Sequence, residues 1–502
     1  MKSLGRAVAS GAVWMVALKL IERSIGFVST VILARLLVPA DFGLVAMSMA
    51  LFAILEVIGS FGFDQALIRQ RSNDPAQFNT AWTLTVCHGI FSATVLLLVA
   101  GPAAAFFKDP RLESIVQVLA LAAFVQGFEN IGIVLYRKEL QFRKDFAFFL
   151  GKKLLAFAVT VSLAFWLRSY WALVAGIVVS RTAGVVLSYL VNSYRPRISF
   201  AATGDLFRFS RWILLNGLLD YTRGRSPDFI LGRFASAGTL GVFRISSELA
   251  SLPTSELMYP VMRAAYPGYS KVAHDRLALK RAFLSVQGMV ITLTLPAGIG
   301  IALLADPIVR VLLGPNWLAA VPIVQVLALH GALRVFRLTN NAVFNVLGAP
   351  YWNTAFSAIE TITIAPVFGW LIYSGVSLDV AVWAYLAASS IVVPFAVMVM
   401  SRYLRLSFGD RLATMWRPVL GCTTMAVALI LLGDTTAIPT DARSSITVLA
   451  IFIPVGACVY FVTIIGSWWL AGRPVGPETR ALDLLSRSIE KLTSLQWKRS
   501  GY

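Results

Sequence analysis

The feature that most constrains this chain is its succession of apolar runs, each about as long as a membrane is thick. About 20 apolar residues are enough for an α-helix to cross the hydrocarbon core of a bilayer. Because backbone polar groups find no water in that core, each crossing segment is expected to be a helix. The sequence therefore predicts an all-α integral membrane protein with about 14 transmembrane helices. The predicted spans lie near residues 10–34, 43–63, 81–105, 113–135, 146–167, 170–192, 211–232, 238–262, 283–304, 317–346, 353–373, 378–400, 417–433 and 446–470.

Composition and motifs exclude most enzyme classes. Of the 502 residues, 58% are hydrophobic and 14% are charged, whereas soluble domains average about 45–50% apolar and about 25% charged residues. A water-soluble multidomain enzyme does not fit these values. The sequence has no P-loop, HExxH or GxSxG motif, and its three Cys and three His do not form a convincing metal site. We expect neither an enzyme nor a bound cofactor or metal.

The net charge of +19 has to be explained by the places where the cations lie. Such an excess can reflect nucleic-acid binding, anionic lipid or membrane orientation. If the N-terminus is cytoplasmic, the segments on that side carry 27 Lys and Arg, and the opposite loops carry seven. Since cytoplasmic loops are enriched in Lys and Arg, both termini of this multi-pass chain are expected in the cytoplasm. Orientation thus accounts for most of the basic excess, and we expect no nucleic-acid partner.

A self-comparison at a shift of 198 residues aligns the first span with the seventh. The shift matches Trp14 with Trp212, Glu22 with Asp220, Leu33 with Leu231, Arg35 with Arg233, and Gly43 with Gly241. Apolar helices also align easily by chance, but this shift pairs two acidic residues inside spans. It predicts two parallel six-helix lobes, an arrangement known from alternating-access transporters. The predicted parts are the lobes 1–200 and 201–402, helices 13 and 14 at 403–472, and a basic cytoplasmic tail at 473–502.

Ionisable side chains inside the spans are the candidates for function. A charge at the centre of a membrane helix costs about 2.5–3.5 kcal/mol unless it faces water or a partner. We take fifteen such residues, nearly balanced in charge, and expect them to line a wet interior. The cations are Lys19, Arg23, Arg181, Arg223, Arg225, Arg244, Arg334 and Arg337. The anions are Glu22, Glu56, Glu129, Asp220, Asp228, Glu248 and Glu360.

Spacing sorts these charges onto helix faces, because residues three or four apart share a face. The clearest face belongs to the tenth span and carries His330, Arg334, Arg337, Asn341 and Asn345. Cations and amides on one surface suit an anionic, hydroxyl-rich ligand such as a phosphate-bearing saccharide. The predicted substrate-binding residues of the cavity are Arg334, Arg337, Asn341, Asn345, Arg223, Arg225, Arg244, Lys19, Arg23 and Arg181.

Carboxylates inside the spans suggest a coupling ion. Glu22, Asp220, Glu248 and Glu360 are predicted to bind H+ or Na+ during transport. The alternative is a network of interhelical ion pairs that only holds the bundle together. That alternative applies to Glu22 with Arg23, to Arg244 with Glu248, and to Arg334 and Arg337.

Three sequence stretches resemble the polysaccharide transporter family, the Wzx-type flippase branch of the multidrug, oligosaccharidyl-lipid and polysaccharide exporter superfamily. They are RSIGFVSTVILARLLVPADFGLVAM at 23–47, FGFDQALIRQ at 61–70 and LYRKELQFRK at 135–144. The resemblance implies two lobes around a central cavity in a bacterial inner-membrane protein. It also implies alternating access and flipping of an undecaprenyl-diphosphate-linked oligosaccharide from the cytoplasmic to the periplasmic leaflet, for exopolysaccharide, capsule or O-antigen assembly.

The sequence also fits other functions. A lipid II flippase and a cation-coupled multidrug exporter belong to the same superfamily. A non-transporting membrane scaffold of an envelope-assembly complex is the alternative from another class. The expected partners are the lipid-linked oligosaccharide, membrane lipids, and the polymerase or export proteins of a polysaccharide assembly system.

Overall fold

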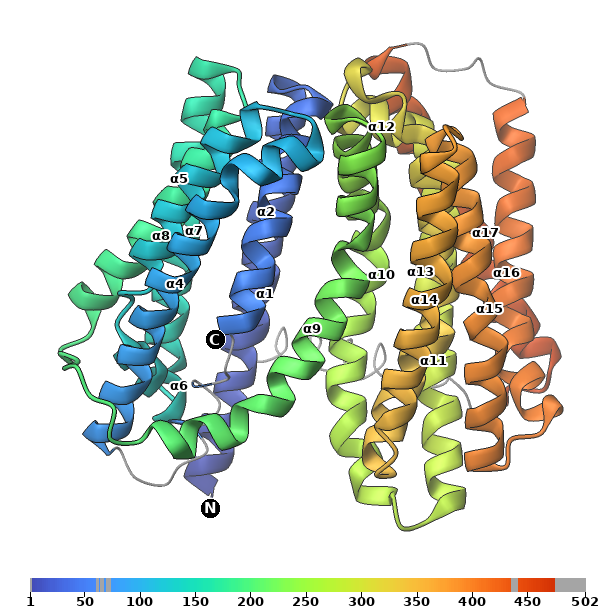
Figure 1. Cartoon of the computed structure of the whole chain (residues 1–502). Coiled ribbons are helices and arrows are strands. Elements are labelled where there is room, and N and C mark those ends of the chain that lie inside the picture. Colours follow the sequence, from blue (N-terminus) through green and yellow to red (C-terminus); the bar gives the residue numbers. More distant parts are fainter. Residues whose placement is uncertain (1, 60–62, 64–66, 69–73, 435–440, 475–502) are drawn as a thin grey trace, which may run out of the picture. The chain divides into compact units, whose positions relative to one another are not determined.

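The computed structural model describes residues 2–59, 63, 67–68, 74–434 and 441–474 (Figure 1). All regular secondary structure in these ranges is helical, which confirms the predicted all-α class. The helices pack into two units. Unit 1 comprises Met1–Arg244 with Gly369–Gly375, and unit 2 comprises Ile245–Phe368 with Val376–Tyr502.

The described helices begin and end as follows. The first part of the chain contains α1 (Lys2–Leu36), α2 (Pro39–Gly59), α4 (Pro75–Phe107), α5 (Arg111–Gln126), the 3-10 turn η1 (Ile131–Ile133), α6 (Val134–Lys138), α7 (Phe142–Leu167), α8 (Trp171–Val191), α9 (Thr203–Phe234) and α10 (Ala237–Val272). The second part contains α11 (Arg276–Leu303), α12 (Ala305–Leu312), the 3-10 turn η2 (Pro315–Trp317), α13 (Ala320–Val346), α14 (Tyr351–Tyr373), α15 (Leu378–Leu404), α16 (Phe408–Asp434) and α17 (Ala442–Leu470).

The predicted spans correspond to these helices. Among the described residues, ten helices are long and apolar enough to cross a membrane, and α5 with the segment 131–138 passes the same test as a bent pair. The remaining predicted spans fall on α1, α9 and α10, which are 35, 32 and 36 residues long and carry much of the interior charge. Each of the fourteen spans thus has a helical counterpart, while the number of actual membrane crossings stays a prediction.

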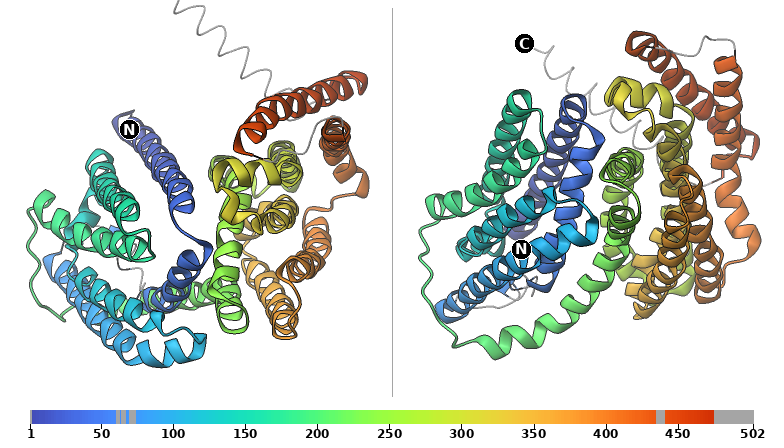
Figure 2. Two further views of the ribbon diagram at one scale, coloured as in Figure 1. Left: turned by 90° about the horizontal axis from the view of Figure 1, so that it is seen from above. Right: turned by 45° about the horizontal axis from the view of Figure 1, so that its top comes forward.

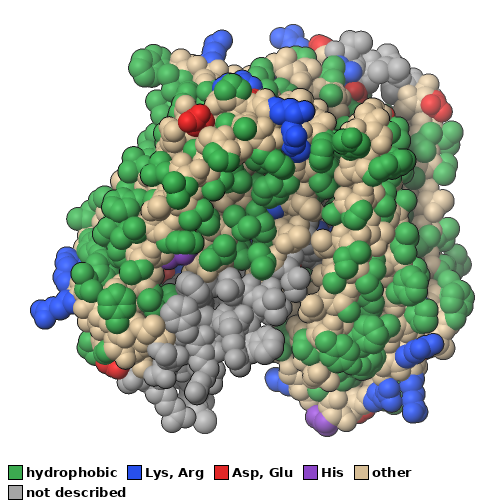
Figure 3. All heavy atoms as spheres, viewed as in Figure 1, with side chains coloured by type: hydrophobic (Ala, Val, Ile, Leu, Met, Phe, Trp, Pro, Cys, Tyr) green, Lys and Arg blue, Asp and Glu red, His purple; other side chains and the backbone are tan. Residues whose placement is uncertain are grey.

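The surface of the helices is apolar along their sides. Hydrophobic side chains predominate on the face shown in Figure 3, and most of its Lys and Arg lie near helix ends. Trp166, Leu190 and Leu470 are 81%, 75% and 81% exposed. Large apolar side chains are unfavourable when they are exposed to water because of the hydrophobic effect. They carry no such penalty when they face lipid, which is itself apolar. The chain is therefore built as an integral membrane protein.

The fourth span is broken, and its prediction as one continuous helix over 113–135 is wrong. α5 ends at Gln126, and the helical segment that follows is bent by 64° from it. Gly127 lies against the backbone of Gly89 in α4, where an added Cβ would come within 3.0 Å of Gly89 Cα. Asn130 then stabilises the break, because its Oδ1 accepts the Gly132 amide at 2.9 Å and its Nδ2 donates to the Tyr194 carbonyl at 2.7 Å. A close backbone approach and a buried amide side chain thus replace the helical ladder.

Two glycines that the repeat pairs at a shift of 198 make reciprocal contacts. A Cβ on Gly43 would lie 1.7 Å from the Ala237 carbonyl oxygen, and a Cβ on Gly241 would lie 1.8 Å from the Pro39 carbonyl oxygen. Ala237 follows Pro39 by the same 198 residues. The two contacts are therefore reciprocal, because each joins one member of a pair to the partner of the other, while the repeat itself stays a prediction. α9 belongs to unit 1, and the predicted lobe boundaries at 200 and 402 stay a prediction.

Unit 2 is held by long helices that pack side by side (Figures 1 and 2). α11 packs against α13 and α16, α13 packs against α15, and α16 packs against α17. Phe283, Phe344 and Met400 belong to one fully buried cluster. Tyr460 of α17 donates its hydroxyl to the Thr292 carbonyl of α11 at 2.7 Å. The last two helices are thereby fixed to the rest of the unit.

Candidate functional site

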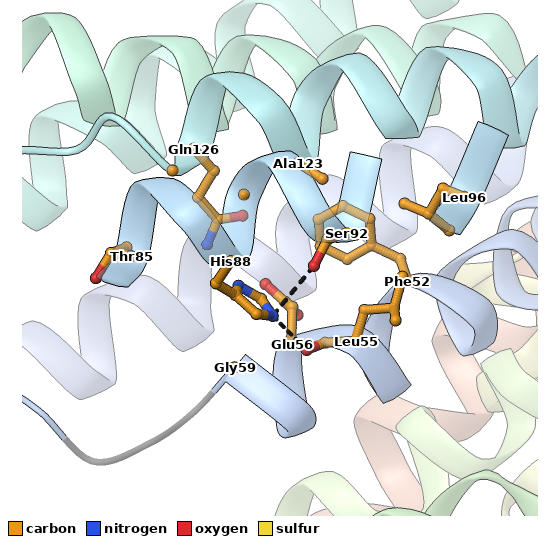
Figure 4. Close-up of a pocket in the computed structure, with 12 residues that line it drawn as sticks. Phe52, Leu55, Glu56, Gly59, Thr85, His88, Ser92, Leu96, Ala123 and Gln126 are labelled. Atoms are coloured by element: carbon orange, nitrogen blue, oxygen red, sulfur yellow. Dashed lines mark hydrogen bonds between the residues drawn. The ribbon is translucent and has the colours of Figure 1, made fainter. Parts of the chain in front are cut away.

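A cavity of about 340 Å³ with several polar side chains in its lining lies in unit 1 between α2, α4 and α5 (Figure 4). Glu56 of α2, His88 of α4 and Gln126 of α5 point toward one another across it. His88 Nε2 is 2.9 Å from the Leu55 carbonyl and 3.1 Å from Ser92 Oγ. Polar side chains from three helices therefore share one space inside predicted membrane spans.

Glu56 is paired with a cation from a fourth helix. Arg181 of α8 places Nη2 2.7 Å from Glu56 Oε1. The Arg181 guanidinium also lies over the Phe52 ring, 5.2 Å from its centroid. An ion pair and a cation–π contact together lower the cost of holding an arginine in this region. Arg181, a predicted cavity residue, thus faces a carboxylate that was counted among the interior charges but not assigned a role.

A second cavity, of about 200 Å³, continues the polar lining at the helix break and shares Thr85 and Gln126 with the first. It is lined by Glu129, which lies 3.5 Å from Lys152 Nζ of α7. It is also lined by Arg137, whose Nε is 3.0 Å from Asp145 Oδ1. Polar groups therefore extend from the predicted cytoplasmic loop at 135–144 to the Glu56 carboxylate.

A third group of charges surrounds Asp228 of α9. Its side chain is 0% exposed, and the Arg244 guanidinium of α10 binds both of its carboxylate oxygens. Arg225 Nη1 adds a contact of 3.3 Å from the same helix as Asp228. The sequence paired Arg244 with Glu248 as one alternative, whereas the described bond runs to Asp228. Two predicted cavity cations thus share one buried carboxylate.

In unit 2, α13 carries the predicted stripe of polar residues, which consists of His330, Arg334, Arg337, Asn341 and Asn345. One member of this stripe forms a buried ion pair. Arg337 Nη2 lies 2.8 Å from Glu360 Oε2 of α14, and the two residues are 3% and 5% exposed. His330 packs edge-on against Tyr385 with 5.2 Å between ring centroids. Arg334 is half-buried, and its Nε has no hydrogen-bond partner within the described part of the chain. Arg337 therefore has the interhelical partner that a structural ion-pair network requires, whereas no ion pair of Arg334 is found among the described residues.

The amides of the same stripe meet a residue of α14. Asn353 Nδ2 donates to Asn345 Oδ1 at 2.9 Å and to the Asn341 carbonyl at 3.3 Å. Asn345 is exposed, whereas Asn341 is half-buried. These amides fix α14 to α13, and their assignment to substrate binding stays a prediction.

The remaining predicted site residues are scattered over α1, α9 and α10. On α1, Lys19 is exposed, and Glu22 and Arg23 are half-buried. Asp220 of α9 is exposed, and Glu248 of α10 is half-buried. The side chain of Arg223 lies outside the described residues. None of the five described side chains, Lys19, Glu22, Arg23, Asp220 and Glu248, lines the cavities described above.

Sequence reasoning overlooked two lysines. Lys152 and Lys153 lie within the predicted span 146–167 but were missing from the fifteen interior charges. The sequence likewise indicated no role for His88, which lines the first cavity. The signal for the lysines was available, since a Lys pair inside a span is as unusual as the charges that were counted. The pairing of His88 with α2 depends on tertiary packing and has no sequence signal.

The fold and these interior charges define a polytopic membrane protein of the transporter type. Residues 32–322 match a family model described as "Polysaccharide biosynthesis protein". This match covers more than half of the chain, so the chain belongs to that family. The lipopolysaccharide biosynthesis protein WzxC of Escherichia coli (strain K12) is 25% identical over 336 residues, which cover 66% of this chain and 68% of WzxC.

Other comparisons agree with this family. The succinoglycan biosynthesis transport protein ExoT of Rhizobium meliloti (strain 1021) is 26% identical over 326 residues, covering 64% of this chain and 66% of ExoT. Among solved structures, the lipid II flippase MurJ in its inward closed conformation superposes with a TM-score of 0.73. It shares 12% sequence identity, and the match covers 91% of this chain and 99% of MurJ. The chain therefore shares its fold with this structure.

Proposed function

We propose that the protein is a flippase that moves an undecaprenyl-diphosphate-linked oligosaccharide across the bacterial inner membrane. The family match over residues 32–322 is the observation that carries this proposal. Relatives named for lipopolysaccharide and succinoglycan biosynthesis support a polysaccharide precursor as the cargo. The name of ExoT as a transport protein supports translocation and not glycosyl transfer. The MurJ-like fold supports the same class of reaction.

Alternating access between two lobes is the proposed mechanism, as in other transporters built from repeats. The interior cations would hold the diphosphate and the sugar through charge-assisted hydrogen bonds, while the polyprenyl chain stays in lipid. A coupling ion, H+ or Na+, would bind at carboxylates inside the helices. Both termini are proposed to be cytoplasmic. The polymerase and export proteins of a polysaccharide assembly system are the proposed partners.

Depletion of the protein tests the proposed function directly. We expect the undecaprenyl-diphosphate-linked repeat unit to accumulate on the cytoplasmic leaflet, as measured by lipid extraction and by its resistance to an enzyme added to the periplasmic side. Accumulation of lipid II would assign the protein to cell-wall synthesis instead. Retention of a cationic dye with normal glycan lipids would indicate a drug exporter. If no intermediate accumulates and interior arginine variants behave as wild type, the scaffold function is favoured.

A further inference from the structure

A third cavity in unit 1 is lined by two cations. It has a volume of about 430 Å³ and lies among α1, α2, α7 and α8. Lys153 and Arg181 line it together with the hydroxyl groups of Ser29, Thr160 and Ser180. The described lining residues include no carboxylate. Its polar lining is therefore positive, with hydroxyl groups from Ser29 and Ser180, while the Thr160 hydroxyl already donates to the Ala156 carbonyl at 2.7 Å.

Lys153 brings a charge to this cavity that the described residues do not neutralise. Its neighbour Lys152 points to the other side of α7 and pairs with Glu129 at 3.5 Å. Lys153 instead reaches toward α1, where its Nζ lies 3.9 Å from the position that a Cβ would take on Gly26. No ion pair joins Lys153 to a carboxylate in the part of the chain that the structure describes. A lysine in such a place within a span needs a function or an anion to balance it.

The two cations lie at neighbouring levels of the antiparallel pair α7 and α8. Gly184 is opposite Lys152, since a Cβ on Gly184 would lie 2.8 Å from Lys152 Nζ. Thr160 packs on Gly176, where an added Cβ would lie 1.8 Å from Thr160 Oγ1. These two contacts place Lys153 of α7 level with residue 183 of α8, so Arg181 is only about half a helical turn from the level of Lys153. Both cations are therefore placed to bind one ligand.

Arg181 lines this cavity and is paired with a carboxylate that lines another one. Its guanidinium lies 2.7 Å from Glu56, which lines the cavity of about 340 Å³ on the α4 side. The same Arg181 side chain lines the cavity of about 430 Å³ on the α7 side. An anion entering the second cavity would compete with Glu56 for this guanidinium. The Glu56 carboxylate thus acts as an internal counter-ion when the second cavity holds no anion.

We propose that Lys153 and Arg181 form a binding site for the diphosphate of the carried lipid, with Glu56 as the competing counter-ion. This proposal rests on the proposed function, because it takes a polyprenyl diphosphate as the ligand. A guanidinium binds phosphate oxygens through two parallel hydrogen bonds, and an ammonium adds a compact charge. The hydroxyls of Ser29 and Ser180 supply further donors. Binding of the diphosphate would weaken the Arg181–Glu56 pair, so cargo and carboxylate are linked through one side chain.

Direct binding tests this site. The probe is farnesyl diphosphate, titrated into the full-length protein in nanodiscs of zwitterionic lipid, with farnesol and inorganic diphosphate as comparison ligands. We expect the wild-type protein to bind farnesyl diphosphate and not farnesol. Lys153→Gln and Arg181→Gln should each weaken binding about tenfold, because each removes a charge-assisted contact. Glu56→Gln should tighten binding severalfold, because it frees Arg181 from its counter-ion.

Three controls keep the outcome decisive. Lys144→Gln removes an exposed cation from the same helix and should leave the affinity unchanged. Lys153→Arg keeps the charge and should retain binding, which separates loss of charge from misfolding. Nanodiscs with phosphatidylglycerol distinguish the source of the phosphate. Unchanged affinity there supports the diphosphate of the carried lipid, whereas loss of affinity would assign the cavity to membrane lipid headgroups and overturn the proposal.

Several results would contradict the site. They are no binding of farnesyl diphosphate by the wild-type protein, unchanged binding in folded Lys153→Gln, or weaker binding in Glu56→Gln. Failure of the proposed function looks different. In that case depletion leaves the glycan lipids in their normal leaflets, while farnesyl diphosphate still binds in a Lys153-dependent way.

Discussion

Four carboxylates of the described interior, Glu56, Glu129, Asp228 and Glu360, each lie within ion-pair distance of a cation from another helix. Pairing lowers the cost of taking a charge out of water, although it does not remove that cost. When one partner is deleted, the other becomes an uncompensated buried charge. The same residues therefore contribute to stability and are available for exchange with a ligand. Variants that separate these two roles are informative.

Arg337 and Glu360 provide the strongest case for a structural role. Arg337→Met is expected to destabilise the protein by about 3–5 kcal/mol, because it leaves Glu360 buried and unpaired. The double variant Arg337→Met with Glu360→Gln should recover most of that loss. Thermal melting of the purified variants in detergent measures the loss of stability in the single variant and its recovery in the double variant. A double variant as unstable as the single one would show that the pair itself does not explain the loss.

Arg334 is expected to behave in the opposite way. Its Nε has no hydrogen-bond partner within the described residues, so Arg334→Ala should leave the melting temperature and the membrane level nearly unchanged. Export of the glycan should nevertheless fall, because this cation belongs to the predicted substrate surface of α13. Arg402→Ala, which removes an exposed arginine at the end of α15, is the matched control. Normal export by Arg334→Ala would refute its assignment to the cargo.

At the scale of helices, α2 and α10 approach each other so closely at Gly43 and Gly241 that neither position has room for a side chain. Gly43→Ala and Gly241→Ala would each place a Cβ within 2 Å of a carbonyl oxygen. Each is expected to cost about 1–3 kcal/mol, which is typical of overpacking. Gly300→Ala in α11 meets no atom within 4 Å and is the control. Melting temperatures in detergent should fall similarly for Gly43 and Gly241, and unequal losses would contradict the equivalence that the repeat predicts.

The helix boundaries also show what a sequence can reveal. The lengths of the apolar runs correctly predicted a helix at each span, because every helix that crosses a membrane needs the same minimum length. The break after Gln126 was not predicted, because it depends on Gly127 meeting Gly89, a contact between residues 38 positions apart. The partners of the charges were missed for the same reason. Spacing identifies residues on one face of a helix, but Arg337 and Glu360 belong to different helices.

At the scale of the whole molecule, the number of membrane crossings determines whether the two termini lie on the same side of the membrane. With fourteen crossings both termini lie on one side, and with thirteen they lie on opposite sides. The uncertain crossings are α1, α9 and α10, which carry interior charges, and the bent pair of α5 with the segment 131–138. The bias of Lys and Arg toward one set of loops predicts that both termini are cytoplasmic. An even number of crossings is therefore expected.

Fusions at three positions check this topology. A fluorescent protein at either terminus should fluoresce, because it folds in the cytoplasm and not after export through the general secretory pathway. Alkaline phosphatase fused after Lys108, in the connection between α4 and α5, should be active, because that loop is expected in the periplasm. Inactive phosphatase at Lys108 would reverse the predicted orientation. If only the N-terminal fusion fluoresces, the number of crossings is odd. In that case α1, α9, α10 or the bent pair either lies outside the membrane or enters and leaves it on the same side.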